Sequence, residues 1–328
     1  MAQMADADST PTATDGMAGA DGGPRFDLAV TPGGYLWWYA DGFTPDGAHG
    51  VTIIAMLGSV FSPYYAWSGR RDPLDHVALN VAVYGGAGKR WALTERRRGA
   101  LAREASRLAI GPSGLDWDGT RLRVTIDERG APIPLPIRGE LRVYPEAVTA
   151  RRFVLDPGGR HRWWPIAPSA RIEVDLEKPA RRWEGIGYVD MNQGDAPLEA
   201  DFQRWDWSRA HVDGEGVIIY DATFRAGEGA PLALHCRRDG TIDDIPAPPR
   251  TELATTGWRV GRGTRDAAPD RVKLRRTFED TPFYARSLLE TTFDGRPGLA
   301  MHESLDLDRF AKPWVRMLLP FRMPRTLR

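Results

Sequence analysis

The chain has 328 residues, and its 44 Lys and Arg residues balance its 44 Asp and Glu residues, so the formal net charge at pH 7 is +0. This length suits one large domain or two of ordinary size, and the balanced charge does not favour nucleic acid as a partner. The single cysteine, Cys236, excludes a disulfide within the chain and a cluster of thiolate metal ligands. We expect it to be a small buried residue.

The first 24 residues differ in composition from the rest. Met1–Pro24 contains no large apolar residue except methionine, so it is expected to be disordered. It lacks the basic and apolar regions of a secretory signal. The longest apolar run, Val51–Phe61, is shorter than the roughly 20 residues that cross a bilayer. These features predict a cytoplasmic protein without a transmembrane helix.

From Phe26 onward, short extended segments alternate with turn residues. Asp41-Gly42 and Asp46-Gly47 are typical of turns. Residues 101–110 fit either a helix or a strand, and 201–210 show weak helical periodicity. Many short strands at roughly 8–12-residue spacing favour an all-β sandwich or barrel. The expected strands are Gly34–Tyr39, Val51–Leu57, Val77–Tyr84, Trp91–Glu95, Leu115–Trp117, Leu122–Asp127, Ile133–Val143, Arg171–Leu176, Val217–Phe224, Pro231–Cys236, Trp258–Val260, Val272–Arg276 and Ser287–Phe293.

One order of residues occurs twice, at unequal gaps. It indicates a duplication into two barrel-like halves, although a chain rich in Gly and Trp could also produce it by chance. We predict domains at 25–178 and 179–309, each with a Gly-Tyr strand near its start. The two copies are Gly34-Tyr35, Trp37-Trp38, Asp46-Gly47, Gly50-Val51 and Gly187-Tyr188, Trp205 with Trp207, Asp213-Gly214, Gly216-Val217.

The C-terminal segment, residues 310–328, mixes aromatic and aliphatic residues with Lys312 and four arginines and contains no acid. Its prolines prevent one long helix. Basic charge beside aromatic residues is typical of a peripheral membrane anchor. The alternative is a tail that packs on the protein body through Trp314 and Leu318.

Several common sites are absent from the sequence. The six histidines have no metal-ligand spacing, and no glycine-rich dinucleotide motif, P-loop or Gly-x-Ser-x-Gly motif occurs. We therefore expect no metal and no cofactor, and an enzyme of this sequence would work by acid–base chemistry.

The segment from His161 to Trp207 combines tryptophans with groups that can hold a proton, as in an apolar small-molecule site. A strand would place Tyr188, Asp190 and Asn192 on one face. With Trp183 and Tyr188 as apolar neighbours, desolvation would raise the pKa of Asp190 and keep it protonated near neutrality. The alternative for Asp190 is a turn cap or a partner of an arginine.

His161 and Trp163 would also share a strand face. His161 could relay a proton or position a water, and Trp163 could stabilise a cation through its ring; an isolated histidine can equally be structural. We include Trp38, Trp205 and Trp207 among the candidate substrate-binding residues with Trp183 and Asn192, although Trp205 and Trp207 also fit a core or rim.

The sequence contains two groups of motifs: Gly185-Ile-Gly-Tyr-Val-Asp-Met-Asn192 with Phe202-x-x-Trp-x-Trp-x-Arg209, and Gly34-Tyr-x-Trp-Trp-Tyr39 with Gly50-Val51 and Phe61-Ser-Pro-Tyr-Tyr65. These motifs resemble the carotenoid 1,2-hydratase (hydroxyneurosporene synthase) family. The resemblance covers roughly Phe26–Leu319 and implies two tandem lipocalin-like (calycin) β-barrels. It also implies cofactor-independent addition of water to the terminal C1–C2 double bond of acyclic carotenoids such as neurosporene and lycopene. The family's functional residues match His161, Trp163, Tyr188 and Asp190.

The resemblance leads to a mechanistic hypothesis. Neutral Asp190 protonates C2, Trp163 and Tyr188 face the resulting C1 cation, and water adds to C1. His161 or the Asp190 carboxylate takes the water's proton. Peripheral contact with the inner, photosynthetic membrane is expected because carotenoids reside in bilayers, and no obligate protein partner is evident. The alternatives are a lipocalin-like isoprenoid-binding protein, or a cyclase or hydratase of another prenyl substrate.

Overall fold

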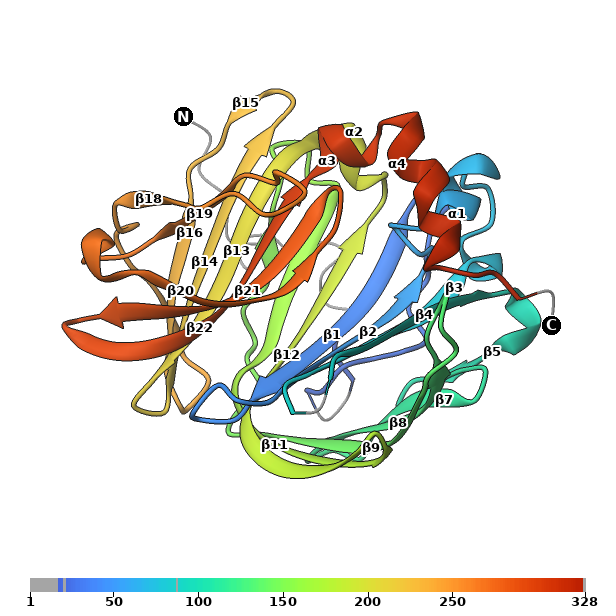
Figure 1. Cartoon of the computed structure of the whole chain (residues 1–328), viewed down its shortest axis with the longest axis horizontal. Helices are drawn as coiled ribbons and strands as arrows, with labels where there is room; N and C mark the ends of the chain where they lie inside the picture. The colour runs from blue at the N-terminus through green and yellow to red at the C-terminus, as the bar shows by residue number, and fades with distance from the viewer. Residues whose placement is uncertain (1–16, 20–21, 87, 327–328) are drawn as a thin grey trace. The chain divides into compact units, whose positions relative to one another are not determined.

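The structure, a computed structural model, describes residues 17–19, 22–86 and 88–326 (Figure 1). They form two compact units. Residues 198–316 make up the second unit, and the described residues before 198, together with those from 317 onward, make up the first. Strands dominate both units, which confirms the all-β, lipocalin-like prediction.

The first unit is built on one antiparallel sheet. Its strands are β1 (Tyr35–Phe43), β2 (Gly50–Leu57), β3 (Val77–Tyr84), β4 (Arg90–Arg96), β5 (Leu101–Glu104), β6 (Arg107–Ile110), β7 (Ser113–Trp117), β8 (Leu122–Arg129), β9 (Pro136–Pro145), β10 (Phe153–Val154), β11 (His161–Lys178) and β12 (Ala180–Gly194). They follow the order β4-β3-β2-β1-β12-β11-β9-β8-β7-β6-β5, and β10 pairs with β11. Since β4 also contacts β8 and β9, the sheet curls into a nearly closed barrel (Figure 1).

Alternate side chains of these strands fill the barrel. On β1, Leu36, Trp38 and Ala40 join an apolar cluster, and on β12 Val189 and Met191 join the same cluster. Most of the other strands add members to it. Apolar side chains therefore occupy the barrel interior, as is usual for small barrels.

The opposite face of the central strands is buried as well. All nine residues of β1 are buried, so Tyr35, Trp37, Tyr39 and Asp41, which alternate with the core residues, lie on a second buried face. A strand buried on both faces reads as a nearly continuous apolar run, as Val51–Leu57 does. Polar groups on the second buried face are consequently shielded from water.

The second unit contains another antiparallel sheet. Its strands are β13 (Phe202–Val212), β14 (Glu215–Phe224), β15 (Gly227–Glu228), β16 (Leu232–Cys236), β17 (Ile242–Asp244), β20 (Lys273–Asp280), β21 (Tyr284–Phe293) and β22 (Arg296–Asp306). They follow the order β17-β16-β14-β13-β22-β21-β20, with β15 beside β14, while β18 (Arg250–Leu253) and β19 (Arg262–Arg265) form a separate pair. Its apolar cluster includes Val212, Ile219 and Leu289. Cys236 is buried, as predicted.

The helices are short. They are α1 (Pro63–Trp67), α2 (Leu198–Asp201), α3 (Leu307–Phe310) and α4 (Pro313–Leu318), with 3-10 turns η2 (Pro73–Asp75), η3 (Arg98–Ala100), η4 (Pro269–Arg271) and η5 (Leu319–Phe321). Within the described part of the chain, none combines the length and the apolar character that crossing a bilayer requires.

The pairing of β12 corrects the predicted domain boundary. A second domain was expected from residue 179, but Ala180–Gly194 pairs with β1 and β11 of the first sheet. The first unit therefore continues to Pro197, and the Gly187-Tyr188 strand does not open a second barrel. Residues 310–328 are not a separate part either, since the chain to Arg316 belongs to the second unit and Met317 onward belongs to the first.

Some local predictions also require correction. Asp41-Gly42 lies inside β1 rather than in a turn, and 201–210 is mostly strand β13 because its apolar residues alternate. Residues 101–110 form two strands, while Trp258 lies in a turn. The prediction of disorder for Met1–Pro24 falls largely outside the described residues; where the chain is described, Met17 is buried in the barrel core, so its exclusion from the fold was wrong.

Candidate active site

Three neighbouring strands, β11, β12 and β1, carry the predicted site. In their register Asp190 lies opposite Tyr39 of β1, and Asn192 lies opposite Trp163 of β11. Tyr188, Asp190 and Asn192 share one face of β12, as the period of two predicts. This is the second buried face, and all three side chains are buried.

Asp190 is held by two donors. The indole Nε1 of Trp163 donates to its Oδ2 over 3.0 Å, and the hydroxyl of Tyr188 donates to the same oxygen over 2.9 Å. Asp190 is only 5% exposed. Aromatic rings surround the pair of donors: Trp163 packs on Phe153 at 5.3 Å, and Tyr188 meets Tyr39 edge to face at 6.0 Å. A carboxyl in such surroundings can exchange a proton with an apolar substrate.

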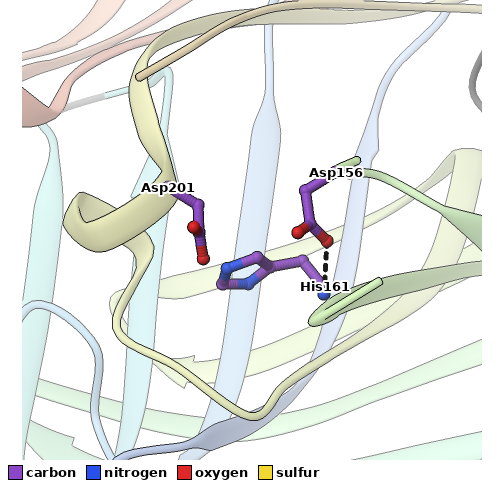
Figure 2. Close-up of side chains that lie close together, drawn as sticks. All are labelled: Asp156, His161 and Asp201. Carbon is purple, nitrogen blue, oxygen red and sulfur yellow. Dashed lines mark hydrogen bonds between the residues drawn. The ribbon is translucent and has the colours of Figure 1, made fainter. Parts of the chain in front are cut away.

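His161 is fixed by contacts to its ring and its backbone. Its Nδ1 shares a 2.9 Å hydrogen bond with the Tyr35 hydroxyl, and the two rings stack at 5.8 Å. The Asp156 carboxylate accepts a 2.7 Å hydrogen bond from the His161 backbone N–H (Figure 2). Gly194 lies opposite His161 on β12, and a Cβ there would stand 2.8 Å from Nδ1. The imidazole orientation is therefore set by Tyr35, by Asp156 and by the absence of a side chain at Gly194.

Asp156 and His161 each offer one ligand atom that could contribute to a metal site. The Asp156 carboxylate also accepts from the backbone N–H groups of His161 and Gly158. Within the first unit, these hydrogen bonds hold the loop between β10 and β11.

A second carboxyl on this face was not predicted from the sequence. Asp41 is fully buried, and its Oδ2 accepts a 2.8 Å hydrogen bond from the Tyr39 hydroxyl. It lies opposite Tyr188 across the β1–β12 pair. The signal that could have identified it is the spacing Tyr39-x-Asp41, which repeats Tyr188-x-Asp190.

Four candidate substrate-binding tryptophans do not belong to this strand face. Trp183 packs against the barrel core, and Trp38 belongs to that core. The expectation that Trp183 is a neighbour of Asp190 is wrong, because residues an odd number of positions apart, here seven, lie on opposite faces of β12. Trp205 and Trp207 lie on β13 of the second unit, where Trp205 packs on Phe202 at 5.3 Å.

Comparison with known proteins gives consistent results. A model of the carotenoid hydratase CrtC family matches residues 53–328. The chain is 60% identical over 307 residues to an acyclic carotenoid 1,2-hydratase of Thiocapsa roseopersicina, covering 92% of this chain and 76% of that protein. It is 49% identical over 312 residues to the protein of the same name from Rubrivivax gelatinosus, covering 93% and 76%.

Solved structures share the fold at low sequence identity. CghA in complex with Sch210972 aligns with a TM-score of 0.57 and 11% identity over 88% of this chain and 92% of that chain. Kievitone hydratase from Nectria haematococca aligns with a TM-score of 0.52 and 11% identity, covering 89% and 97%. At such identity the likeness establishes the architecture alone.

Proposed function

The chain belongs to the carotenoid hydratase CrtC family, and from this premise we propose that it adds water across the terminal C1–C2 double bond of acyclic carotenoids such as neurosporene and lycopene, giving 1-hydroxy carotenoids. The observation that carries the proposal is the buried carboxyl of Asp190, held by Trp163 and Tyr188 in an aromatic wall. Protonation of an alkene needs an acid that stays neutral until the substrate arrives, and apolar surroundings favour the neutral form.

Asp190 is the acid in this proposal. In a neutral carboxyl one oxygen accepts hydrogen bonds as a carbonyl and the other carries the proton. Trp163 and Tyr188 both donate to Oδ2, which suits the carbonyl role and assigns the proton to Oδ1. The proton goes to C2, because the positive charge then falls on C1, a tertiary carbon. As the proton leaves, the same two donors stabilise the carboxylate.

The cation at C1 is stabilised by the rings of Trp163 and Tyr188. Water bonds to C1 and gives a proton to a base, for which His161 and the Asp190 carboxylate are candidates. The cycle returns every proton it uses and needs no redox partner, so we propose that the reaction is cofactor-independent. The competing functions are a binding protein for isoprenoids and a cyclase or hydratase of another prenyl substrate.

The substitution Asp190→Asn tests the proposal in a lycopene-producing host. The wild-type chain should give a pigment heavier by one water, and Asp190→Asn should abolish this product while pigment still binds. Asp175→Asn is the matched control, because Asp175 is an exposed partner of Arg182 on β11. A purified wild-type protein that needs added metal or nucleotide, or that binds lycopene without ever hydrating it, would refute the proposal.

We also propose that the segment 312–322 docks on an anionic membrane surface, from which the substrate is taken. The alternative is a tail that packs through Trp314 and Leu318; Trp314 stacks on Trp258 at 6.5 Å, but Trp314 and Leu318 remain 46% and 41% exposed. Val315 and Leu319 are the buried residues of this segment. Lys312 precedes the exposed apolar side chains and Arg322 follows them, and basic residues beside apolar ones favour anionic lipid. The exposed set is Trp314, Met317, Leu318 and Phe321.

Flotation with vesicles tests this surface. The double variant Met317→Glu with Phe321→Glu should lose binding to vesicles that contain anionic lipid, whereas Ile133→Glu should not, although Ile133 is comparably exposed at 66%. Equal binding by the double variant and the wild type would exclude this segment as the docking surface.

A further inference from the structure

Two Tyr-x-Asp pairs lie side by side on the second buried face. Tyr39 and Asp41 belong to β1, and Tyr188 and Asp190 belong to β12. The register sets Tyr39 opposite Asp190 and Asp41 opposite Tyr188, so the two acids occupy one diagonal of a square and the two tyrosines the other. Each hydroxyl donates to the acid of its own strand, over 2.8 Å and 2.9 Å. Asp41 thus shares with the proposed acid a tyrosine donor two residues earlier on its own strand.

The spacing of the two carboxyls suits an acid and a base acting on one substrate. The backbones of diagonal neighbours on an antiparallel pair lie roughly 7–8 Å apart, and their Cβ atoms are somewhat closer. Inverting glycosidases hold their acid and base about 6.5–9.5 Å apart, which leaves room for the substrate and an attacking water. Asp41 and Asp190 are 0% and 5% exposed. Because a nearby like charge disfavours ionisation of a buried carboxyl, one neutral acid beside one carboxylate is the favoured pair.

A hydroxyl on the next strand supplies a second group for the water. Thr52 of β2 lies opposite Asp41 and is fully buried. Its Oγ1 has no hydrogen-bond partner within the described part of the chain, which is costly unless water or a ligand meets it. Side chains directly opposite each other have Cβ atoms about 4.5–5.5 Å apart, and a buried water typically makes two to four hydrogen bonds. A water between Thr52 and Asp41 would satisfy the hydroxyl.

We propose that Asp41 is the base of the hydration and that it holds the attacking water together with Thr52; this inference rests on the proposed function. The O–H bond of Asp190 breaks as the C2–H bond forms. The water oxygen then bonds to C1, and Asp41 takes one of its protons while the electron pair of that O–H bond stays on oxygen. The Tyr39 hydroxyl is hydrogen-bonded to Asp41, and Tyr39 lies opposite Asp190 in the strand register. It accepts this proton from Asp41 and gives its own to Asp190. Asp41 is then a carboxylate again and Asp190 is again neutral.

Isotope exchange in D2O separates the two carboxyls. The experiment uses the purified full chain with lycopene in detergent micelles, and follows both the hydrated product and deuterium at C2 of recovered lycopene. Asp41→Asn should hydrate at least about 100-fold more slowly, the usual contribution of a general base. It should still place deuterium at C2, because Asp190 can deliver a deuteron and take a proton back. Asp190→Asn should lose both reactions.

Thr52→Val serves as the second variant because it removes only the hydroxyl. It should slow hydration about tenfold, the effect of one hydrogen bond, and retain exchange, and Asp175→Asn should change neither reaction. The inference is overturned if Asp41→Asn hydrates lycopene at the wild-type rate. It is also overturned if Asp41→Asn loses both hydration and exchange while its unfolding temperature stays unchanged. If Asp41→Asn does not fold, wild-type hydration by Thr52→Val overturns it. A wild-type chain that neither hydrates lycopene nor exchanges its C2 proton fails the proposed function itself.

Discussion

Removal of one hydroxyl, by Tyr188→Phe, should slow the proposed hydration without unfolding the protein. The hydroxyl donates to Asp190 Oδ2 over 2.9 Å in a buried environment. Hydrogen bonds to a charged group contribute about 1.5–3 kcal/mol. The carboxylate forms only as the proton leaves for C2, so most of this contribution should be lost in the transition state. At about 1.4 kcal/mol per tenfold change, kcat should fall roughly 10- to 150-fold.

The phenylalanine keeps the ring, so any stabilisation of the C1 cation by the π face is retained. Tyr188→Leu removes the ring as well and should slow the reaction further. The assay is the initial rate of lycopene hydration with saturating substrate, with urea denaturation of each variant in parallel. KM should change little, because the substrate has no polar group to meet the hydroxyl.

A matched control is available on β9. The Tyr144 hydroxyl donates to Glu173 Oε2 over 3.0 Å, so Tyr144→Phe removes the same kind of bond from a carboxylate that has no part in the proposed reaction. It should leave kcat unchanged. A Tyr188→Phe variant that folds normally and hydrates within twofold of the wild type would refute the role of the Asp190 donors.

Three further predictions concern the histidine site, pH and the C-terminus. Gly194→Ala would place a Cβ 2.3 Å from the Tyr35 ring and 2.8 Å from the imidazole of His161. Hydration should therefore fall, and the free energy of unfolding should drop by about 1–3 kcal/mol. The control Gly99→Ala, whose Cβ would have nothing within 4 Å, should change neither. Burial lowers the pKa of His211 from 6.5 to about 4. Between these pH values the unfolded chain binds a proton that the folded chain does not, so stability should decline as pH falls from about 6.5 to 4. His211→Gln should flatten this part of the plot of unfolding free energy, measured by urea denaturation, against pH. Arg325→Met should destabilise the first unit by about 2–4 kcal/mol in the same denaturation assay, because it leaves the buried carboxylate of Glu95 without its guanidinium partner.

The alternation of side chains predicted which residues of the candidate site share a strand face. It did not predict which sheet contains that strand. Alternation along 188–192 was sufficient to group Tyr188, Asp190 and Asn192, because a strand fixes which side chains share a face whatever it pairs with. The same rule, applied over seven positions, would have placed Trp183 on the other side. Assignment of this strand to a second domain was wrong because its partners, β1 and β11, are set by long-range pairing that the local pattern does not encode.

Asp41 was missed for a related reason. Asp-Gly is a common turn pair, and it was interpreted as one. In the structure β1 is paired on both sides through Gly42, with Val51 on one side and Gly187 on the other. A Cβ at Gly42 would lie 2.6 Å from Ile172 Cγ2, so the glycine is required by close packing inside the barrel rather than by a turn. Tertiary pairing overrode the local turn preference, and Asp41 became a buried strand residue.

The two faces of β1 differ in the polarity of their side chains. Leu36, Trp38 and Ala40 belong to the apolar cluster that fills the barrel, while Tyr39 and Asp41 belong to the polar cluster on the other face. Burial of carboxyls is costly, and neighbouring strands must be held rigidly if hydroxyl donors are to stay within hydrogen-bond distance of them. A barrel filled by apolar side chains provides both the offsetting stability and the fixed register. In the proposed reaction, the polyene would therefore have to reach the second buried face, where the two acids lie, rather than the barrel interior usual for a lipocalin ligand.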